Sequence, residues 1–249
     1  MASGPAETKQ MAAAPDALLS SQIPSTRQSR VKEREDAIIT AARGVFSTHG
    51  YAKATMAMIA RDAGVADGTL YTYFENKDAL ARGVVSDYYA RLTKSAQAGA
   101  ETRRTTRTRL DFLARHHMDS ILEERGIIEM LPILTSDLST YSGSDIYELN
   151  KTYVAIFDGV VREGRASGDI AGDADVASLR DIFFGALDYG FKSHLMRSSR
   201  STARKADMSR LIDQLVGMIL LQNNSSGSLT ERLESIADRL EAALDQTPK

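Results

Sequence analysis

The sequence predicts an all-α protein in which an N-terminal domain of three helices, containing a helix-turn-helix, precedes a larger helical domain. Apolar residues recur three and four positions apart in almost every segment, and no strand-like alternation extends for any length. Near the N-terminus, two short helical patterns are joined by a tight turn that contains glycine. We therefore expect four regions: a tail at 1–32, the helix-turn-helix domain at 33–80, the larger domain at 81–224 and a final helix within 225–249.

The composition excludes several classes of protein. The chain has 249 residues, 43% of them hydrophobic, which is enough to bury a sizeable core. It has no cysteine, so disulfides, thiolate nucleophiles and cysteine zinc sites are excluded. No apolar run approaches the roughly 18 residues of a membrane span, and we expect a cytoplasmic protein without a membrane partner. Because the net charge is −2, contact with nucleic acid would need a local basic patch.

The N-terminal tail, residues 1–32, is rich in Ala, Ser, Pro and Gln and lacks periodicity, which predicts disorder. Its last part is basic, with Arg27, Arg30 and Lys32 just before the first periodic helix. Two interpretations stay open. The basic end is either a flexible arm that follows phosphates or enters a minor groove, or a solubilising leader.

Three short helical patterns make up the first domain. The first begins near Glu33 and ends at Gly50. Thr55 then caps a helix of barely two turns, which Gly64 breaks. The third pattern, ADGTLYTYF, turns Leu70 and Phe74 inward. A new helix is expected to follow Asn76 and run to about Gln97.

Helical patterns fill the larger domain, at 105–124, 126–136, 144–167, 175–197 and 205–222. The last two are apolar over an arc wider than one core-facing stripe. Such an arc indicates burial on two sides, once within the subunit and once against a partner, so we expect these helices to form a homodimer.

The final helix, 229–245, is preceded by the capping-box spacing of Ser228 and Glu231. Apolar residues then recur at alternating intervals of four and three, the spacing of a short coiled coil. Two interpretations stay open: the helix packs on its own domain, or it pairs between subunits.

One stretch, residues 34–80, resembles the DNA-binding domain of the TetR/AcrR family. Several features coincide there: Ala-Ala then Phe in the first helix, HGY before a threonine, IA-x-x-AGV across the turn and GTLYTYF-x-NK-x-AL after it. The resemblance implies a transcriptional repressor that binds a palindromic operator in double-stranded DNA as a homodimer.

The resemblance also implies which residues contact DNA, because the family places the third helix in the major groove. Nearest the base edges would lie Asp67, Gly68, Thr69 and Thr72. Glycine there allows a close approach, and threonine can bond to a base or meet a thymine methyl. Against phosphates, where contacts position the protein without reading sequence, would lie Thr55, Tyr71, Tyr73 and Lys77.

Two of these assignments have an alternative. The tyrosines could simply pack half-buried in the domain. Asp67 could accept a hydrogen bond from a cytosine amine or cap the third helix, and we favour the cap.

The sequence gives little support for an enzyme. The chain has four histidines, and His116 and His117 are adjacent, so on a helix they point about 100° apart and cannot chelate one metal together. The sequence contains no P-loop, no Rossmann glycine set and no G-x-S-x-G. We expect no enzyme, no catalytic residue, no metal and no cofactor.

A small hydrophobic effector is the expected ligand of the larger domain. Apolar and aromatic side chains there could line a cavity or simply form core. The candidates are Phe112, Met118, Leu122, Met130, Leu134, Tyr147, Phe157 and Phe184.

The identity of the effector rests on resemblance alone. AGVADGTLYTYFENK and IFFGALDYGFKSHLM resemble the branch of the family that responds to fatty acyl-CoA, which implies a long-chain acyl-CoA that releases the repressor. The alternative is a repressor of an efflux or catabolic operon that responds to drugs or other hydrophobic ligands. A run of arginines is either a phosphate-binding face or a solvated helix start: Arg103, Arg104, Arg107 and Arg109.

Overall fold

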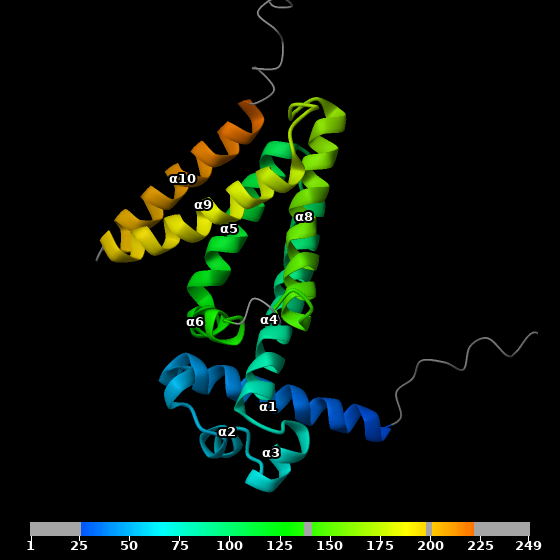
Figure 1. Cartoon of the computed structure of the whole chain (residues 1–249), viewed down its shortest axis with the longest axis vertical. Coiled ribbons are helices and arrows are strands. Elements are labelled where there is room, and N and C mark those ends of the chain that lie inside the picture. Colours follow the sequence, from blue (N-terminus) through cyan, green and yellow to red (C-terminus); the bar gives the residue numbers. More distant parts are fainter. Residues whose placement is uncertain (1–25, 137–140, 198–200, 222–249) are drawn as a thin grey trace, which may run out of the picture.

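The computed structural model describes residues 26–136, 141–197 and 201–221, and this part of the chain contains helices and no strand (Figure 1). The predicted all-α fold is confirmed. The helices are α1 (Thr26–Lys53), α2 (Met56–Asp62), α3 (Asp67–Tyr73), α4 (Lys77–Glu101), α5 (Thr106–Glu123), α6 (Arg125–Leu134), α8 (Asp145–Ser167), α9 (Val176–Arg197) and α10 (Ser201–Leu221). The helix expected at 229–245 lies outside the described residues.

The first helix begins earlier than predicted. α1 starts at Thr26, so the tail expected at 1–32 is helical over its basic end, where the side chains of Arg27, Arg30 and Lys32 are exposed. The expectation of disorder is wrong for 26–32, and residues 1–25 lie outside the described part. Gly50 interrupts α1 where predicted, because its φ of 73° is a left-handed conformation that other residues rarely adopt.

The N-terminal domain, which the sequence predicts to be the DNA-binding domain, is built from α1, α2 and α3. Its core is made by side chains that are fully buried, one or more from each helix: Ile38, Phe46, Ile59 and Leu70. α1 packs on both α2 and α4, and α4 leads from this domain into the larger one (Figure 1).

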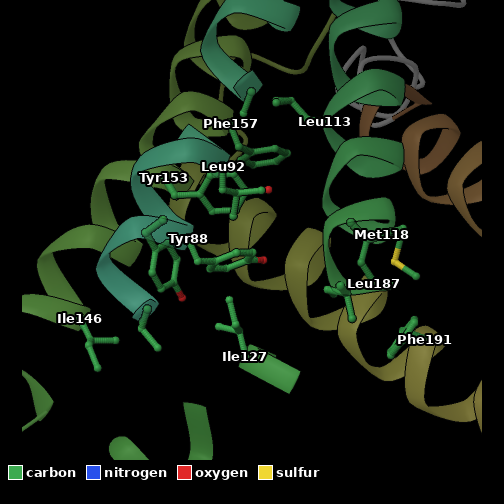
Figure 2. Close-up of a cluster of buried hydrophobic side chains, with 14 of the residues drawn as sticks. Tyr88, Leu92, Leu113, Met118, Ile127, Ile146, Tyr153, Phe157, Leu187 and Phe191 are labelled. Atoms are coloured by element: carbon green, nitrogen blue, oxygen red, sulfur yellow. The ribbon is translucent and has the colours of Figure 1, made fainter. Parts of the chain in front are cut away.

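In the larger domain, α4 packs along α8 and α5, while α9 and α10 pack together and cover α5. Figure 2 shows part of its core, with labelled side chains from α4, α5, α6, α8 and α9. α10 also contributes buried side chains to this core, including Ile212 and Leu215. Tyr88 and Tyr153 lie in this core at 4% and 3% exposure, which places polar hydroxyls inside an otherwise apolar interior.

Candidate functional site

The turn between α2 and α3 is built by residues that the sequence singled out. Thr55 is the N-cap of α2, and its Oγ1 accepts a hydrogen bond of 3.2 Å from the Met58 N–H. Gly64 has a φ of 65°, and the Val65 N–H next to it donates to the Ala60 carbonyl over 2.9 Å. The exposed Thr55 hydroxyl can still donate to a phosphate, as the prediction for this residue requires.

α3 has one buried side and one open side. Leu70 is fully buried and Phe74 is 8% exposed, as predicted. Thr69 and Tyr73 are half-buried, whereas Tyr71 is 53% exposed. The open side also carries Asp67, Gly68 and Thr72. These residues form a surface that the major groove of DNA can approach.

Gly68 is not required by the protein itself. A Cβ built on it would meet no atom within 4 Å, and its φ is not among the positive values found in the described residues. Neither packing nor backbone conformation therefore demands glycine here. Close approach of a partner would demand it, which supports the prediction that Gly68 faces DNA.

The prediction that Asp67 caps α3 is wrong. The N-cap is Ala66, no side chain accepts a hydrogen bond there, and Asp67 is the first residue of the helix. Its exposed carboxylate still interacts favourably with the positive end of the helix dipole. A hydrogen bond from a cytosine amine to Asp67 stays a prediction.

Two predicted DNA contacts are also held within the domain. The Thr72 hydroxyl donates to the Thr69 carbonyl over 2.6 Å, so it can meet DNA as an acceptor and through its methyl group. Lys77 Nζ donates to the carbonyls of Tyr51 and Ala54 over 2.9 and 3.2 Å. An ammonium has three N–H donors, so Lys77 keeps one for a phosphate while it ties α4 to the end of α1.

Tyr51 is a residue whose role the sequence did not indicate, although it stands in the HGY motif. Its hydroxyl donates to Asp78, and its ring lies 4.5 Å from Lys77 Nζ. Burial, followed by this hydrogen bond, raises the pKa of Tyr51 to about 12. The protonated phenol thus joins the end of α1 to the start of α4.

The two domains also meet where α6 packs on α1. A Cβ built on Gly126 would lie 2.7 Å from the Cα of Ser47, so only glycine allows this close contact between backbones. The position of α6 is therefore directly coupled to the position of α1 in the DNA-binding domain.

A network of four charges lies at the same junction, and we call it the junction clasp. Arg43 of α1 lies 3.8 Å from Asp87 of α4 and 3.7 Å from Glu124 at the joint of α5 and α6. Arg91 of α4 pairs with the same two carboxylates, over 2.9 and 3.1 Å. The clasp thus connects α1, α4 and the start of α6 by charge.

A pocket of about 510 Å³ lies among α4, α5, α6, α8 and α9, and we call it the effector pocket. One part of its lining is aliphatic and comes largely from α5 and α6, including Ile121, Ile128 and Leu131. The other part is aromatic or polar and comes largely from α4, α8 and α9. The charged side chains that line it belong to α9 alone: Arg180, Asp181, Asp188 and Lys192.

His117 is the polar centre of the effector pocket. Its Nδ1 lies 3.2 Å from the Tyr153 hydroxyl and its Nε2 lies 3.2 Å from Asp188 Oδ1. Its ring stacks on Tyr153 at a centroid distance of 6.0 Å and meets the Phe184 ring edge-on at 5.0 Å. Burial raises the pKa of Tyr153 well above its usual value, so this phenol keeps its proton.

Most of the residues predicted to bind a ligand lie elsewhere. Of the eight candidates, Phe184 lines the effector pocket, and Phe112 lines a neighbouring one between α4 and α5. Met118, Met130 and Phe157 are at most 2% exposed and belong to the core, whereas Leu122 is 46% exposed. Tyr147 packs edge-on against Tyr141 at 5.5 Å, and Leu134 is half-buried against the core.

The sequence did not single out Tyr88, Tyr89, Asn150 and Tyr153 as pocket residues. The signal that could have found them is a set of tyrosines and one asparagine on helices whose other inward positions are apolar. Periodicity places such residues inside the domain but does not show which of them border a cavity.

The arginine run lies at the joint of α4 and α5 and does not line the effector pocket. Arg103 stacks on Phe112 at 3.7 Å, and Arg109 pairs with Glu163. Arg104 and Arg107 are exposed. This arrangement favours the solvated helix start over the phosphate-binding face.

The wide apolar arc of α10, which the sequence predicts to be shared between the core and a dimer face, turns Leu215 toward the core. Leu215 is 4% exposed and packs in the core of its own subunit, so it is not available as a residue of the interface. Among the side chains of α9 and α10 that the structure describes, the large apolar ones left exposed are Ile182, Tyr189 and Met218, at 48%, 72% and 62%. Ala186 is half-buried and packs against the core.

The described residues contain no group of three or more histidine or acidic side chains placed to hold a metal ion. None of their helices combines the length and the apolar character that crossing a membrane requires.

Two family models match the chain. The model described as bacterial regulatory proteins, tetR family, matches residues 38–84, and the model described as YsiA-like protein, C-terminal region, matches residues 89–222. Among curated proteins, the fatty acid metabolism regulator protein of Bacillus subtilis is 28% identical over 176 residues, which cover 70% of this chain and 89% of that protein. The transcriptional repressor KstR2 of Rhodococcus jostii is 25% identical over 162 residues, covering 61% and 76%.

Solved structures extend this similarity to the fold. The regulator FadR of Bacillus subtilis, in complex with stearoyl-CoA, aligns with a TM-score of 0.62 at 26% identity, covering 75% of this chain and 98% of that one. The fatty acid degradation regulator FadR of Bacillus halodurans aligns with a TM-score of 0.62 at 25% identity, covering 75% and 94%. The alignments therefore span nearly the whole length of both relatives.

Proposed function

Because this chain belongs to the TetR family of bacterial regulatory proteins, we propose that it is a dimeric repressor that leaves a palindromic operator when a long-chain acyl-CoA binds. The family match and the curated relatives show that this chain is a transcriptional regulator related to the regulators of fatty acid metabolism. The effector, the operator contacts and the dimer are the proposal.

The observation that carries the proposal is the position of α6. One part of this helix lines the effector pocket through Ile128 and Leu131, and its first turn touches the backbone of α1 at Gly126. A ligand that displaces α6 therefore acts on the DNA-binding domain through direct contact. α4 offers a second connection, since it lines the pocket through Tyr88 and begins at Lys77 beside α3.

The lining of the pocket fits an acyl-CoA in two respects. Aliphatic residues of α5 and α6 can cover a hydrocarbon chain, and each buried methylene contributes roughly 0.8 kcal/mol. The exposed ammonium of Lys192 and the guanidinium of Arg180 lie on the same lining and offer cations for phosphates. Arg180 is already paired with Asp158 over 2.9 Å, so Lys192 is the stronger candidate.

Release from DNA then follows from geometry. A symmetric dimer reads a palindrome only when its two recognition helices lie about 34–36 Å apart, one turn of the double helix. An effector that favours a different spacing weakens operator binding. By reciprocity, the operator must weaken effector binding by the same factor.

The test is a titration of saturated acyl-CoAs of increasing chain length against the protein bound to a labelled operator. We expect release at lower concentration as the chain grows, and no release by free CoA. The variant Val154→Trp fills the pocket and should abolish release while operator binding persists. Ala166→Trp, exposed on the same helix, is the matched control.

Two results would contradict the proposal. A response that does not depend on chain length, or no response to any acyl-CoA, removes the acyl-CoA assignment. Release by unrelated apolar compounds would then favour the alternative, a repressor that responds to drugs or other hydrophobic ligands.

A further inference from the structure

The effector pocket holds more hydrogen-bonding groups than a site for plain hydrocarbon needs. Tyr153, His117 and Asp188 form one chain of contacts, with 3.2 Å at each step. Tyr89 and Asn150 form a second pair, in which the phenol donates to Asn150 Oδ1 over 3.4 Å. The second distance exceeds the usual value of about 2.7–2.8 Å for O–H···O bonds, so this pair is weakly held.

The direction of each bond in the first chain follows from donor and acceptor chemistry. The Asp188 carboxylate can only accept a hydrogen bond, so His117 Nε2 carries the hydrogen and donates a hydrogen bond to it. In a neutral imidazole the other nitrogen, Nδ1, is then an acceptor, and it takes the hydrogen bond of the Tyr153 hydroxyl. The Tyr153 oxygen keeps lone pairs that can accept from a ligand.

The second pair of residues, Tyr89 and Asn150, provides a hydrogen-bond donor that complements these acceptors. Once the Tyr89 hydroxyl donates to Asn150 Oδ1, its oxygen also keeps lone pairs, while the Asn150 NH₂ has no hydrogen bond to any residue within the described part of the chain. The rings of Tyr89 and Tyr153 lie 6.5 Å apart. Two phenol oxygens that accept and one amide that donates thus lie on the wall of the same pocket.

We propose that the effector pocket selects acyl groups that carry a hydroxyl. A hydroxyl is the small group that donates to a phenol oxygen and accepts from an amide N–H at the same time. The inference rests on the proposed function and names the class of acyl group within it. The aliphatic wall formed by Ile121, Ile128 and Leu131 covers the remaining hydrocarbon.

The experiment measures binding to the full chain by calorimetry without DNA. The ligands are dodecanoyl-CoA, 3-hydroxydodecanoyl-CoA and 12-hydroxydodecanoyl-CoA, so chain length is constant and only the hydroxyl varies. We expect at least one hydroxylated ester to bind about fivefold more tightly than dodecanoyl-CoA, the effect of one additional net hydrogen bond. A ratio of one or less for both esters overturns the inference.

Variants test whether the named groups cause the preference. Asn150→Leu removes the amide at similar size and should reduce the ratio to about one, whatever its effect on the affinity for dodecanoyl-CoA. Tyr89→Phe removes one acceptor and should lower the ratio even where Asn150→Leu fails to fold. Tyr141→Phe, a half-buried tyrosine outside the pocket lining, is the control and should keep the ratio. An unchanged ratio in both pocket variants overturns the inference.

The same esters titrated against operator-bound protein separate this inference from the proposed function. Preference for a hydroxyl without release of the operator supports the inference and contradicts the proposed function. Release of the operator by all three esters alike, without preference for a hydroxyl, does the reverse. Binding by none of the esters overturns both.

Discussion

In the DNA-binding domain most of the residues assigned to DNA are exposed, whereas in the larger domain most of the groups assigned to the effector are buried or half-buried. Tyr71 is 53% exposed and Tyr153 is 3% exposed, although both are assigned the same kind of contact, through a hydroxyl. Removing an exposed contact changes binding and little else. Removing a buried one changes stability as well, so tests in the larger domain need substitutions that preserve size.

α10 provides the sharpest test of this difference, because one turn separates a buried from an exposed apolar residue. Leu215→Arg places an unpaired charge in the core of the subunit and should unfold the domain, at a cost of several kcal/mol. Met218→Arg changes a side chain that is 62% exposed and should leave the fold intact while dissociating the dimer. Thermal melting and analytical ultracentrifugation distinguish the two outcomes.

The exposed Gln214→Arg on the same helix is the control for added charge. A Met218→Arg protein that stays dimeric would show that this face is not the interface. A wild-type chain that is monomeric at micromolar concentration would refute the dimer altogether.

The next effect concerns the contact between the domains. Gly126→Ala places a Cβ 2.7 Å from the Ser47 backbone, and overpacking of this kind costs typically 1–3 kcal/mol. We expect α6 to shift and operator affinity to change, measured by fluorescence anisotropy. Gly159→Ala, whose Cβ would meet no atom within 4 Å, is the matched control. Operator binding equal to the wild type in Gly126→Ala would show that α6 does not position α1.

The same contrast explains what sequence could predict. In the DNA-binding domain, Thr55, Gly64 and Leu70 are fixed by local rules of caps, turns and periodicity, and the structure places them as expected. Asp67 was misassigned because the cap of α3 falls one residue earlier, at Ala66, where no side chain bonds. A shift of one residue at a helix end is beyond what sequence rules resolve.

The pocket depends instead on contacts between distant segments. His117 meets Tyr153 and Asp188 from two other helices, and no spacing within one helix records that meeting. Likewise, Met130 and Phe157 have the apolar character of pocket residues, but their side chains are buried in the core. Sequence therefore predicted the helices of the larger domain well and its cavity poorly.

A smaller effect separates reading from positioning on α3 and α4. Thr72→Ala should change the preference at one or two base positions by about 1–3 kcal/mol, since it removes the acceptor and the methyl group that we propose meet the bases. Lys77→Ala should weaken all duplexes and reduce the salt slope by about one unit. Because Lys77 also bonds to two carbonyls, its loss should lower the melting temperature too.

Binding to a randomised operator library and a salt titration measure these changes. Tyr71→Phe is expected to weaken all sequences without a change in melting temperature, because its side chain is exposed. If Thr72→Ala weakens every sequence equally, α3 does not read bases through this residue.

The smallest expected effect lies in the junction clasp, where the charges are partly exposed. Arg43 and Arg91 are 31% and 44% exposed, and ion pairs of this kind contribute at most about 1 kcal/mol each. Arg43→Gln removes the only clasp residue that α1 contributes, so it breaks the charge connection between the domains and leaves Arg91 paired with both carboxylates. We therefore expect little change in melting temperature but a smaller ratio between operator affinities without and with acyl-CoA. The same decrease must appear in the effect of operator on acyl-CoA affinity, because coupling is reciprocal.

Arg91→Gln removes the same charge without removing a contact to α1, so it is the matched control. Both effects should weaken as salt is raised. If Arg43→Gln and Arg91→Gln reduce the ratio equally, the effect belongs to local charge, and coupling passes through the packing of α6 and α4 alone.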